Sequence, residues 1–153
     1  GYYCTLYLSP KDYHRFHVPV DGMIVETRVI PGTLWPVNNW AVEHITDLFC
    51  NNERIVTLIE ERLEKKRIAY VSVGATMVGK IKLNYCDLES NKERSPFSVQ
   101  HAPPLSVSKG QELGRFMFGS TVILLFEKDM LSMLEKPLKS SVKMGEALAC
   151  LQQ

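Results

Sequence analysis

Apolar and polar positions alternate over short segments of the chain, and glycine or proline separates many of these segments. Segments rich in aromatic and β-branched residues predict strands, and they lie at residues 3–8, 22–29, 54–59, 68–73, 76–83, 113–118 and 121–127. Many short strands with such turns between them predict a β-rich fold, all-β to α+β. We expect a single barrel- or sandwich-like domain of mainly antiparallel strands with a few short helices.

Three other segments predict helices and a loop. Ser9 as an N-cap, Pro10 at the first helical position and Asp12 in the first turn predict the start of a short helix. A second short helix is predicted within residues 38–49. Residues 87–104 mix proline, asparagine, serine and charges with little periodicity, which predicts a long loop.

Composition and charge narrow the class of protein. The 153 residues fit one domain, residues 1–153, with one hydrophobic core. The formal net charge of +1 gives no reason to expect nucleic acid as a partner, because nucleic-acid binding needs a clearly basic face. No apolar run approaches the ~18 residues that span a bilayer. The four cysteines stand at none of the spacings typical of zinc ligands, so no metal site is predicted.

Two histidines form the first candidate for chemistry. His14 and His17 are three residues apart, so on a helical turn they would share a face. They are either partly buried or surface histidines, or a general acid/base pair, since histidine titrates near neutrality. Metal binding by this pair alone lacks a third ligand.

The second candidate is Gly119-Ser120, which precedes the apolar segment 122–126. One interpretation is a tight turn or bulge between two core strands. The other is a reactive site, because glycine has no Cβ and the Ser120 Oγ can approach the Gly119 carbonyl carbon without a clash. The apolar strand after it would exclude water from such a site.

Several motifs resemble those of the pyruvoyl-dependent phosphatidylserine decarboxylases, in the family's order and over nearly the whole chain. Phe118-Gly119-Ser120-Thr121 resembles the family's L-G-S-T self-cleavage motif, with Phe118 in place of the usual leucine. The other matching segments are residues 7–19, which contain both histidines, Asn52-Glu53-Arg54, and residues 73–79 and 109–116.

The resemblance implies a site and a cofactor. It implies self-cleavage between Gly119 and Ser120 into a β chain, residues 1–119, and an α chain, residues 120–153. Ser120 would become the pyruvoyl cofactor. His17 matches the family's base in a Ser-His-Asp arrangement, and His14 is our candidate for the acid that reprotonates the product carbon. Three further residues either line the substrate pocket or pack in the core: Phe16, Met117 and Phe118.

The resemblance also implies partners and a location. The substrate would be phosphatidylserine, converted to phosphatidylethanolamine, and the other partners a membrane surface and the α and β chains of the same precursor. Whether the protein forms a homodimer is left open by the resemblance. We expect a membrane-associated protein, at a bacterial inner membrane or a mitochondrial inner membrane, anchored through a region upstream of this chain.

The family's upstream aspartate, which orients the histidine, is also expected in that region. Asp21-Gly22 comes after the histidines and is not assigned this role, so we expect the chain to be a fragment that stays largely uncleaved or cleaves itself slowly. Three alternatives remain at this point. They are a pyruvoyl decarboxylase of another amino acid or serine phospholipid, a fragment unable to process itself, and a non-enzymatic β-barrel module related to carrier domains.

Overall fold

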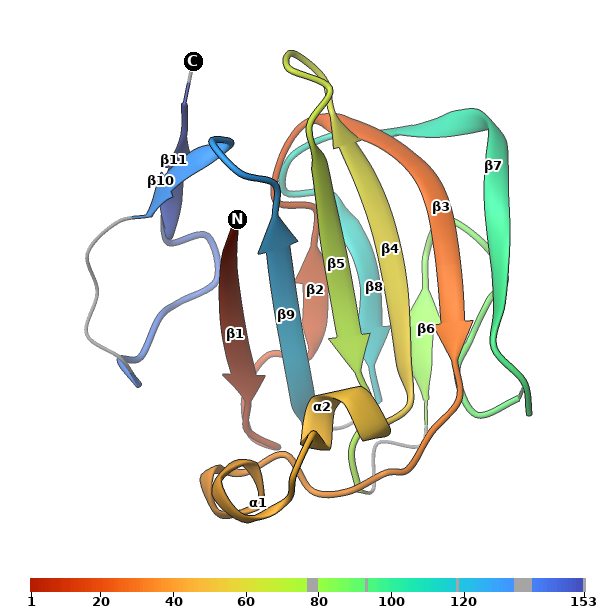
Figure 1. The fold of residues 1–153 in the computed structure, drawn as a ribbon, viewed down its shortest axis with the longest axis vertical. Helices are drawn as coiled ribbons and strands as arrows, with labels where there is room; N and C mark the ends of the chain where they lie inside the picture. The colour runs from red at the N-terminus through yellow and green to blue at the C-terminus, as the bar shows by residue number, and fades with distance from the viewer. Residues whose placement is uncertain (77–79, 93, 118, 134–138, 153) are drawn as a thin grey trace.

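The computed structural model describes residues 1–76, 80–92, 94–117, 119–133 and 139–152 (Figure 1). Strands dominate the described residues, and both helices are short. The strands are β1 Tyr2–Leu8, β2 Arg15–His17, β3 Gly22–Ile30, β4 Arg54–Glu61, β5 Arg67–Val73, β6 Ile81–Leu83, β7 Phe97–Val107, β8 Glu112–Phe116, β9 Ser120–Phe126, β10 Leu131–Met133 and β11 Ala149–Leu151. The helices are α1 Asn39–His44 and α2 Leu48–Asn51.

Two antiparallel sheets form a sandwich. The larger sheet has six strands in the order β1-β9-β5-β4-β3-β7. The smaller sheet, β2-β8-β6, lies behind it in Figure 1, and β10 pairs only with β11 at one side. This architecture confirms the predicted β-rich fold of antiparallel strands.

The core lies between the two sheets, and an aromatic contact joins them. Phe16 of β2 is buried, and its ring centroid lies 4.9 Å from that of Phe116 in β8. The same ring stacks on Tyr70 of β5, in the larger sheet, at 5.6 Å. Strand alternation turns Ile55, Ile59, Val122 and Leu124 into the same core.

The helix predicted at Ser9 is wrong, and the segment is a turn. The Asp12 carboxylate accepts a hydrogen bond from the Ser9 amide at 2.8 Å, and the Asp12 amide donates to the Ser9 carbonyl at 2.8 Å. The same residue types that begin helices also close turns, and here the chain continues as β2. Residues 15–17 are therefore extended, so His14 and His17 do not share a helical face.

The long loop predicted at residues 87–104 is wrong from Phe97 onward, because β7 begins there. This strand lies at the edge of the six-stranded sheet, and among the described strands it pairs with β3 alone. Prolines are tolerated in such an edge strand, because its outer side forms no hydrogen bonds with another described strand. The helix predicted at residues 38–49 is split in two, with Asp47 at φ 53° ahead of α2. Of the strand predicted at 76–83, β6 is described, whereas residues 77–79 lie outside the described part.

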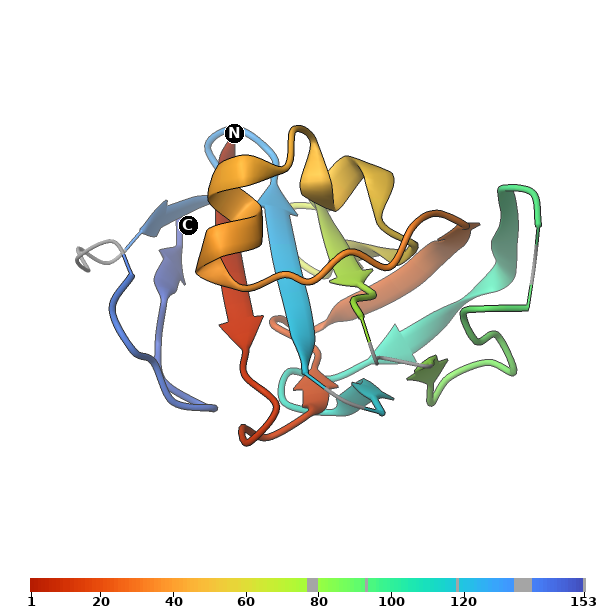
Figure 2. The same ribbon diagram turned by 90° about the horizontal axis from the view of Figure 1, so that it is seen from below.

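Both helices lie against one end of the larger sheet, where β5 ends and β9 begins (Figures 1 and 2). The Asn38 side chain accepts a hydrogen bond from the Ala41 amide at 3.0 Å, which caps α1. Neither described helix has the length and apolar character that crossing a bilayer requires.

Candidate active site

The Gly119–Ser120 peptide lies at the start of β9, an inner strand of the larger sheet. Ser120 is opposite Leu8 of β1, and Thr121 is opposite both Tyr7 of β1 and Val73 of β5. Ser120 and Thr121 are fully buried. The serine therefore lies in a water-poor part of the fold, between paired strands.

Gly119 is in close contact with the turn after β1. A Cβ at this position would lie 2.8 Å from the Pro10 nitrogen and 3.0 Å from the Leu8 carbonyl oxygen. Any side chain would push this turn away, so the close approach requires glycine. The turn thus packs directly on the peptide that is predicted to be cut.

The Ser120 hydroxyl donates a hydrogen bond to the carbonyl oxygen of Val73. The next residue of that segment is held from the other side, because the Gly74 amide donates to the Glu53 carbonyl at 2.8 Å. The Asn52 side-chain amide donates to the Gly74 carbonyl at 2.9 Å. The end of β5 therefore fixes the hydroxyl of the predicted nucleophile.

His14 lies beside the same turn. Its Nε2 is 3.0 Å from the Pro10 carbonyl oxygen, which only accepts, so Nε2 carries a proton in this contact. Its own carbonyl accepts a hydrogen bond from the Phe116 amide at 2.9 Å. Pro10 contacts both His14 and Gly119, so one turn connects this histidine with the scissile peptide.

His17 has both ring nitrogens engaged elsewhere. Nδ1 is 2.8 Å from the Gly110 carbonyl oxygen and therefore carries a proton. Nε2 is 2.9 Å from the Tyr13 hydroxyl, and the two rings stack at 5.7 Å with an interplanar angle of 15°. In the neutral ring, Nε2 accepts the Tyr13 hydrogen.

The register of β2 with β8 separates the two histidines. His17 is opposite Glu112, at the start of β8, whereas the His14 carbonyl meets Phe116, at its end. The chain continues from the end of β8 to Gly119 and Ser120. The scissile peptide therefore follows the end of β8 that contacts His14, not the end that contacts His17. The structure therefore brings His14, Gly119 and Ser120 to one end of the sandwich.

The three predicted substrate-binding residues have different surroundings. Phe16 is buried in the core between the two sheets. Met117 is 59% exposed, and its amide donates to the Lys80 carbonyl at 3.1 Å. Phe118 lies outside the described residues.

The charges near His17 are paired. The Arg15 guanidinium donates two hydrogen bonds to the Glu112 carboxylate, at 2.7 and 2.8 Å. Hydrogen bonds from Asn84 and Arg15 hold the pKa of Glu112 below its ordinary value, against an opposing effect of desolvation. Within the described part of the chain, no three histidine, cysteine or acidic side chains gather as metal ligands do.

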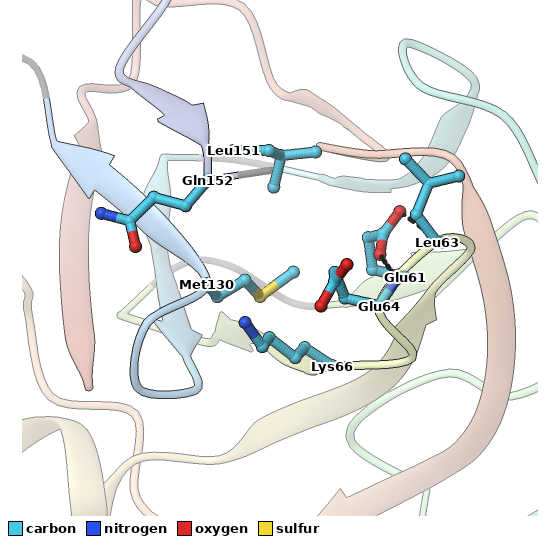
Figure 3. Close-up of a pocket in the computed structure, with 7 residues that line it drawn as sticks. All are labelled: Glu61, Leu63, Glu64, Lys66, Met130, Leu151 and Gln152. Atoms are coloured by element: carbon cyan, nitrogen blue, oxygen red, sulfur yellow. Dashed lines mark hydrogen bonds between the residues drawn. The ribbon is translucent and has the colours of Figure 1, made fainter.

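A pocket of about 350 Å³ lies at the other end of β9 (Figure 3). Its lining comes from the β4–β5 hairpin and the C-terminal segment, and consists of Glu61, Leu63, Glu64, Lys66, Met130, Leu151 and Gln152. The Glu61 carboxylate accepts hydrogen bonds from the amides of Leu63 and Glu64, both at 2.8 Å, and these bonds close the hairpin turn. The pocket thus adjoins none of the predicted catalytic residues.

Sequence reasoning assigned no role to three residues that contact the predicted site residues, or to Asn52, which contacts Gly74 next to Val73. Asn52 belongs to the Asn-Glu-Arg motif, and a polar residue directly before an apolar strand was its only signal. Tyr13 and Gly110 lie within matching motifs, but their contacts with His17 depend on tertiary packing. Val73 contacts Ser120 through its backbone carbonyl, which every residue type has, so its side chain gave no indication of this contact.

The fold and the site together define a β-sandwich protein with a buried Gly-Ser pair at the head of an inner strand. A family model described as phosphatidylserine decarboxylase matches residues 1–150. The chain belongs to the phosphatidylserine decarboxylase family.

Curated relatives are similar over most of this chain. The phosphatidylserine decarboxylase proenzyme of Anaeromyxobacter sp. (strain K) is 47% identical over 130 residues, covering 83% of this chain and 45% of the relative. The proenzyme of Myxococcus xanthus is 46% identical over 127 residues, with the same shares. That of Helicobacter pylori is 38% identical over 149 residues, or 96% of this chain and 54% of the relative. The chain spans about half the length of these relatives.

Proposed function

We propose that this chain is the catalytic part of a pyruvoyl-dependent phosphatidylserine decarboxylase that cleaves itself between Gly119 and Ser120. One observation carries the proposal: a glycine that tolerates no side chain precedes a fully buried serine at the head of an inner strand. The relatives are named as proenzymes, which supports a processed precursor. The products are a β chain, residues 1–119, and an α chain, residues 120–153.

Self-cleavage begins with the Ser120 hydroxyl. Its Oγ attacks the Gly119 carbonyl carbon while a base takes the hydroxyl proton. The Gly119–Ser120 C–N bond then breaks, the proton passes to the released Ser120 amine, and an ester joins Gly119 to Oγ. A base then removes the Ser120 α-proton, and elimination releases Gly119 as a carboxylate. Water adds to the remaining dehydroalanine and ammonia leaves, which gives the pyruvoyl group.

We assign the two histidines to different steps. His17 is the base of self-cleavage. Because it lies opposite Glu112, away from Ser120, this role requires the segment that carries it to move until Nε2 leaves the Tyr13 hydroxyl and reaches the Ser120 hydroxyl. His14, next to the turn at Pro10, supplies the proton that the product carbon needs during turnover. General acid/base catalysis of this kind contributes about 10²–10⁴-fold to the rate.

The surroundings of Ser120 fit a pyruvoyl group. The side chain is fully buried, and the Val73 carbonyl is the polar atom that it meets. A pyruvoyl group formed from Ser120 would supply a ketone able to bind the substrate amine and to act as an electron sink for decarboxylation. Surroundings poor in water favour this reaction, because the charged carboxylate leaves as neutral carbon dioxide.

The proposed substrate, phosphatidylserine, requires a membrane surface near the site. Exposed aromatic residues at this end of the sheet support such a contact, since tryptophan and tyrosine are enriched at membrane interfaces. They are Tyr7, opposite Thr121, and Trp35 and Trp40 beside and within α1, which are 46%, 49% and 63% exposed. Membrane association, at a bacterial or mitochondrial inner membrane, is part of this proposal, and a homodimer is compatible with it.

Intact mass spectrometry of the purified chain tests the proposal. Two fragments, 1–119 and 120–153, should accumulate, the second with a blocked N-terminus. Ser120→Ala should stay whole and inactive, while its unfolding free energy changes by about 1 kcal/mol or less, as for one hydrogen bond. An uncut chain that decarboxylates phosphatidylserine, or a Ser120→Ala variant that does so, would contradict the pyruvoyl mechanism.

A further inference from the structure

Asn52 is a fully buried polar residue between α2 and β4, and its side chain makes four hydrogen bonds. Oδ1 accepts from the Thr33 hydroxyl at 2.9 Å and from the Trp35 amide at 3.0 Å. The Nδ2 group donates to the carbonyls of Trp35 and Gly74, both at 2.9 Å. All of its usual hydrogen-bonding capacity is used, so the side chain has one defined orientation.

Gly74 connects Asn52 with Ser120, because the preceding residue, Val73, accepts a hydrogen bond from the Ser120 hydroxyl. Asn52 and the Glu53 carbonyl hold Gly74 from the β4 side, through its carbonyl and its amide. The Gly74 amide and the Val73 carbonyl belong to one planar peptide group. The Glu53 carbonyl, which accepts from the Gly74 amide, therefore fixes the direction of the Val73 carbonyl, and that carbonyl accepts a hydrogen bond from the Ser120 hydroxyl. Asn52 holds the carbonyl of the following peptide group, so Gly74 is held on both sides.

We propose that Asn52 is a positioning residue for self-cleavage, which rests on the proposed function of the Gly119–Ser120 pair. Together with the Glu53 carbonyl, it restricts rotation of the backbone at Gly74, which keeps the preceding Val73 carbonyl on the Ser120 hydroxyl. Before attack, that hydrogen bond selects the serine rotamer and leaves the lone pairs of Oγ directed away from Val73; the hydroxyl proton passes to the base when Oγ adds to the Gly119 carbonyl carbon. Asn52 contacts neither residue of the scissile peptide, so it acts through the end of β5.

The oxygen and the nitrogen of the Asn52 amide have different partners, so substitutions can distinguish a role in cleavage from a role in stability alone. Its oxygen ties the Thr33–Trp35 loop to the end of α2, whereas its nitrogen reaches Gly74. Asn52→Asp keeps two acceptor oxygens in nearly the same shape but removes both donors. Thr33→Val removes a partner of the oxygen and leaves the contact with Gly74, so it is the matched control.

The experiment measures the cleavage rate of the complete chain by intact mass, together with its unfolding free energy. At neutral pH, Asn52→Asp should cleave about 10²-fold more slowly than wild type, the scale of a small misplacement of reacting groups. Thr33→Val should lose stability but cleave close to the wild-type rate. The ratio of the Asn52→Asp rate to the wild-type rate should rise toward acid pH, because a protonated carboxyl regains one O–H donor.

A second variant keeps the proposal testable if Asn52→Asp does not fold. A Cβ at Gly74 would lie 3.2 Å from both the Glu53 carbonyl oxygen and Leu34 Cδ2. Gly74→Ala should therefore shift this peptide, with Asn52 unchanged, and slow cleavage as well.

The outcomes distinguish this inference from the proposed function. A folded Asn52→Asp variant that cleaves as fast as Thr33→Val overturns the inference, and so does a rate ratio that is independent of pH. A wild-type rate in folded Gly74→Ala also overturns it. A wild-type chain that is never cut overturns the proposed function, and the inference with it.

Discussion

At the scale of single residues, the two histidines differ in their hydrogen-bond partners. His17 is bound through both ring nitrogens to Tyr13 and Gly110. His14 contacts the turn that packs on Gly119. Their proposed roles can therefore be separated by single substitutions.

His17→Ala should leave the chain uncut, because no base would then serve the acyl shift or the elimination. His14→Ala should be cut but turn over about 10²–10⁴-fold more slowly, since its role comes later. The measurements are intact mass for cleavage and carbon dioxide release for turnover. If His14→Ala blocks cleavage and His17→Ala does not, the two roles are reversed, and the closeness of His14 to the scissile peptide would explain it.

Thr121, directly after the nucleophile, has a buried hydroxyl without a hydrogen-bond partner in the described part of the chain. Burial of an unpaired hydroxyl is unfavourable, so Thr121→Val should raise the unfolding free energy by about 1 kcal/mol. Thr57→Val is the matched control, because the Thr57 hydroxyl is 2.7 Å from the Tyr85 hydroxyl and its loss should destabilise. Denaturant unfolding measures both, and a destabilised Thr121→Val would show that its hydroxyl has a partner.

Glu112 gives a pH dependence with a defined sign. Its pKa in the folded chain lies below the ordinary value of 4.5, so its stabilising contribution is present above that value. The contribution is lost as the pH falls through the lower, folded-state pKa. Unfolding free energy, measured across this acid range in the Ser120→Ala background, should fall less steeply after Glu112→Gln. Equal slopes would contradict the assigned interaction with Asn84 and Arg15.

At the scale of elements, β8 has a tight contact that depends on one glycine. A Cβ at Gly114 would lie 2.5 Å from the Lys82 carbonyl oxygen in β6, 2.6 Å from Phe16 Cζ and 2.8 Å from its Cε2. Gly114→Ala should therefore push β8 away from β6 and displace the Phe16 ring from its place between the sheets, at a cost of about 1–3 kcal/mol, as for other overpacked cores. Thermal unfolding would measure this loss. An unchanged melting temperature would mean that the two sheets separate easily at this point.

The elements that were predicted correctly are those with a strong local pattern. The segments 54–59 and 68–73 are rich in apolar and β-branched residues and became β4 and β5. The edge strand β7 has a mostly exposed face and two adjacent prolines, so its pairing with β3 left little local signal. The turn at Ser9 was mistaken for a helix because tertiary pairing with β8, rather than local preference, makes residues 15–17 a strand.

The site was predictable as far as it depends on motifs. Gly119, Ser120 and the histidines were found from their matches to a family pattern. The contacts that hold them come from backbone groups at Val73, Gly110 and Pro10, which any residue type supplies. Such contacts depend on the fold alone, so no sequence pattern identified them.

At the scale of the whole molecule, the proposed cleavage would place strands of one sheet in two different chains. Strand β9 would belong to the α chain, yet it pairs with β1 and β5 of the β chain over nearly its whole length. The two chains should therefore co-elute in native chromatography and separate only in denaturant. Two separate peaks under native conditions would show that this pairing does not survive cleavage. Uncut Ser120→Ala, run in parallel, gives the elution volume of the intact fold.

The position of Ser120 also sets the character of the end that cleavage would create. Chain ends usually fray, because few contacts tie them down. This end would instead form inside a sheet, with a neighbouring strand on each side and no solvent-accessible surface. A reactive group carried there would have the positional order of a core residue, although it is formally the first residue of a chain.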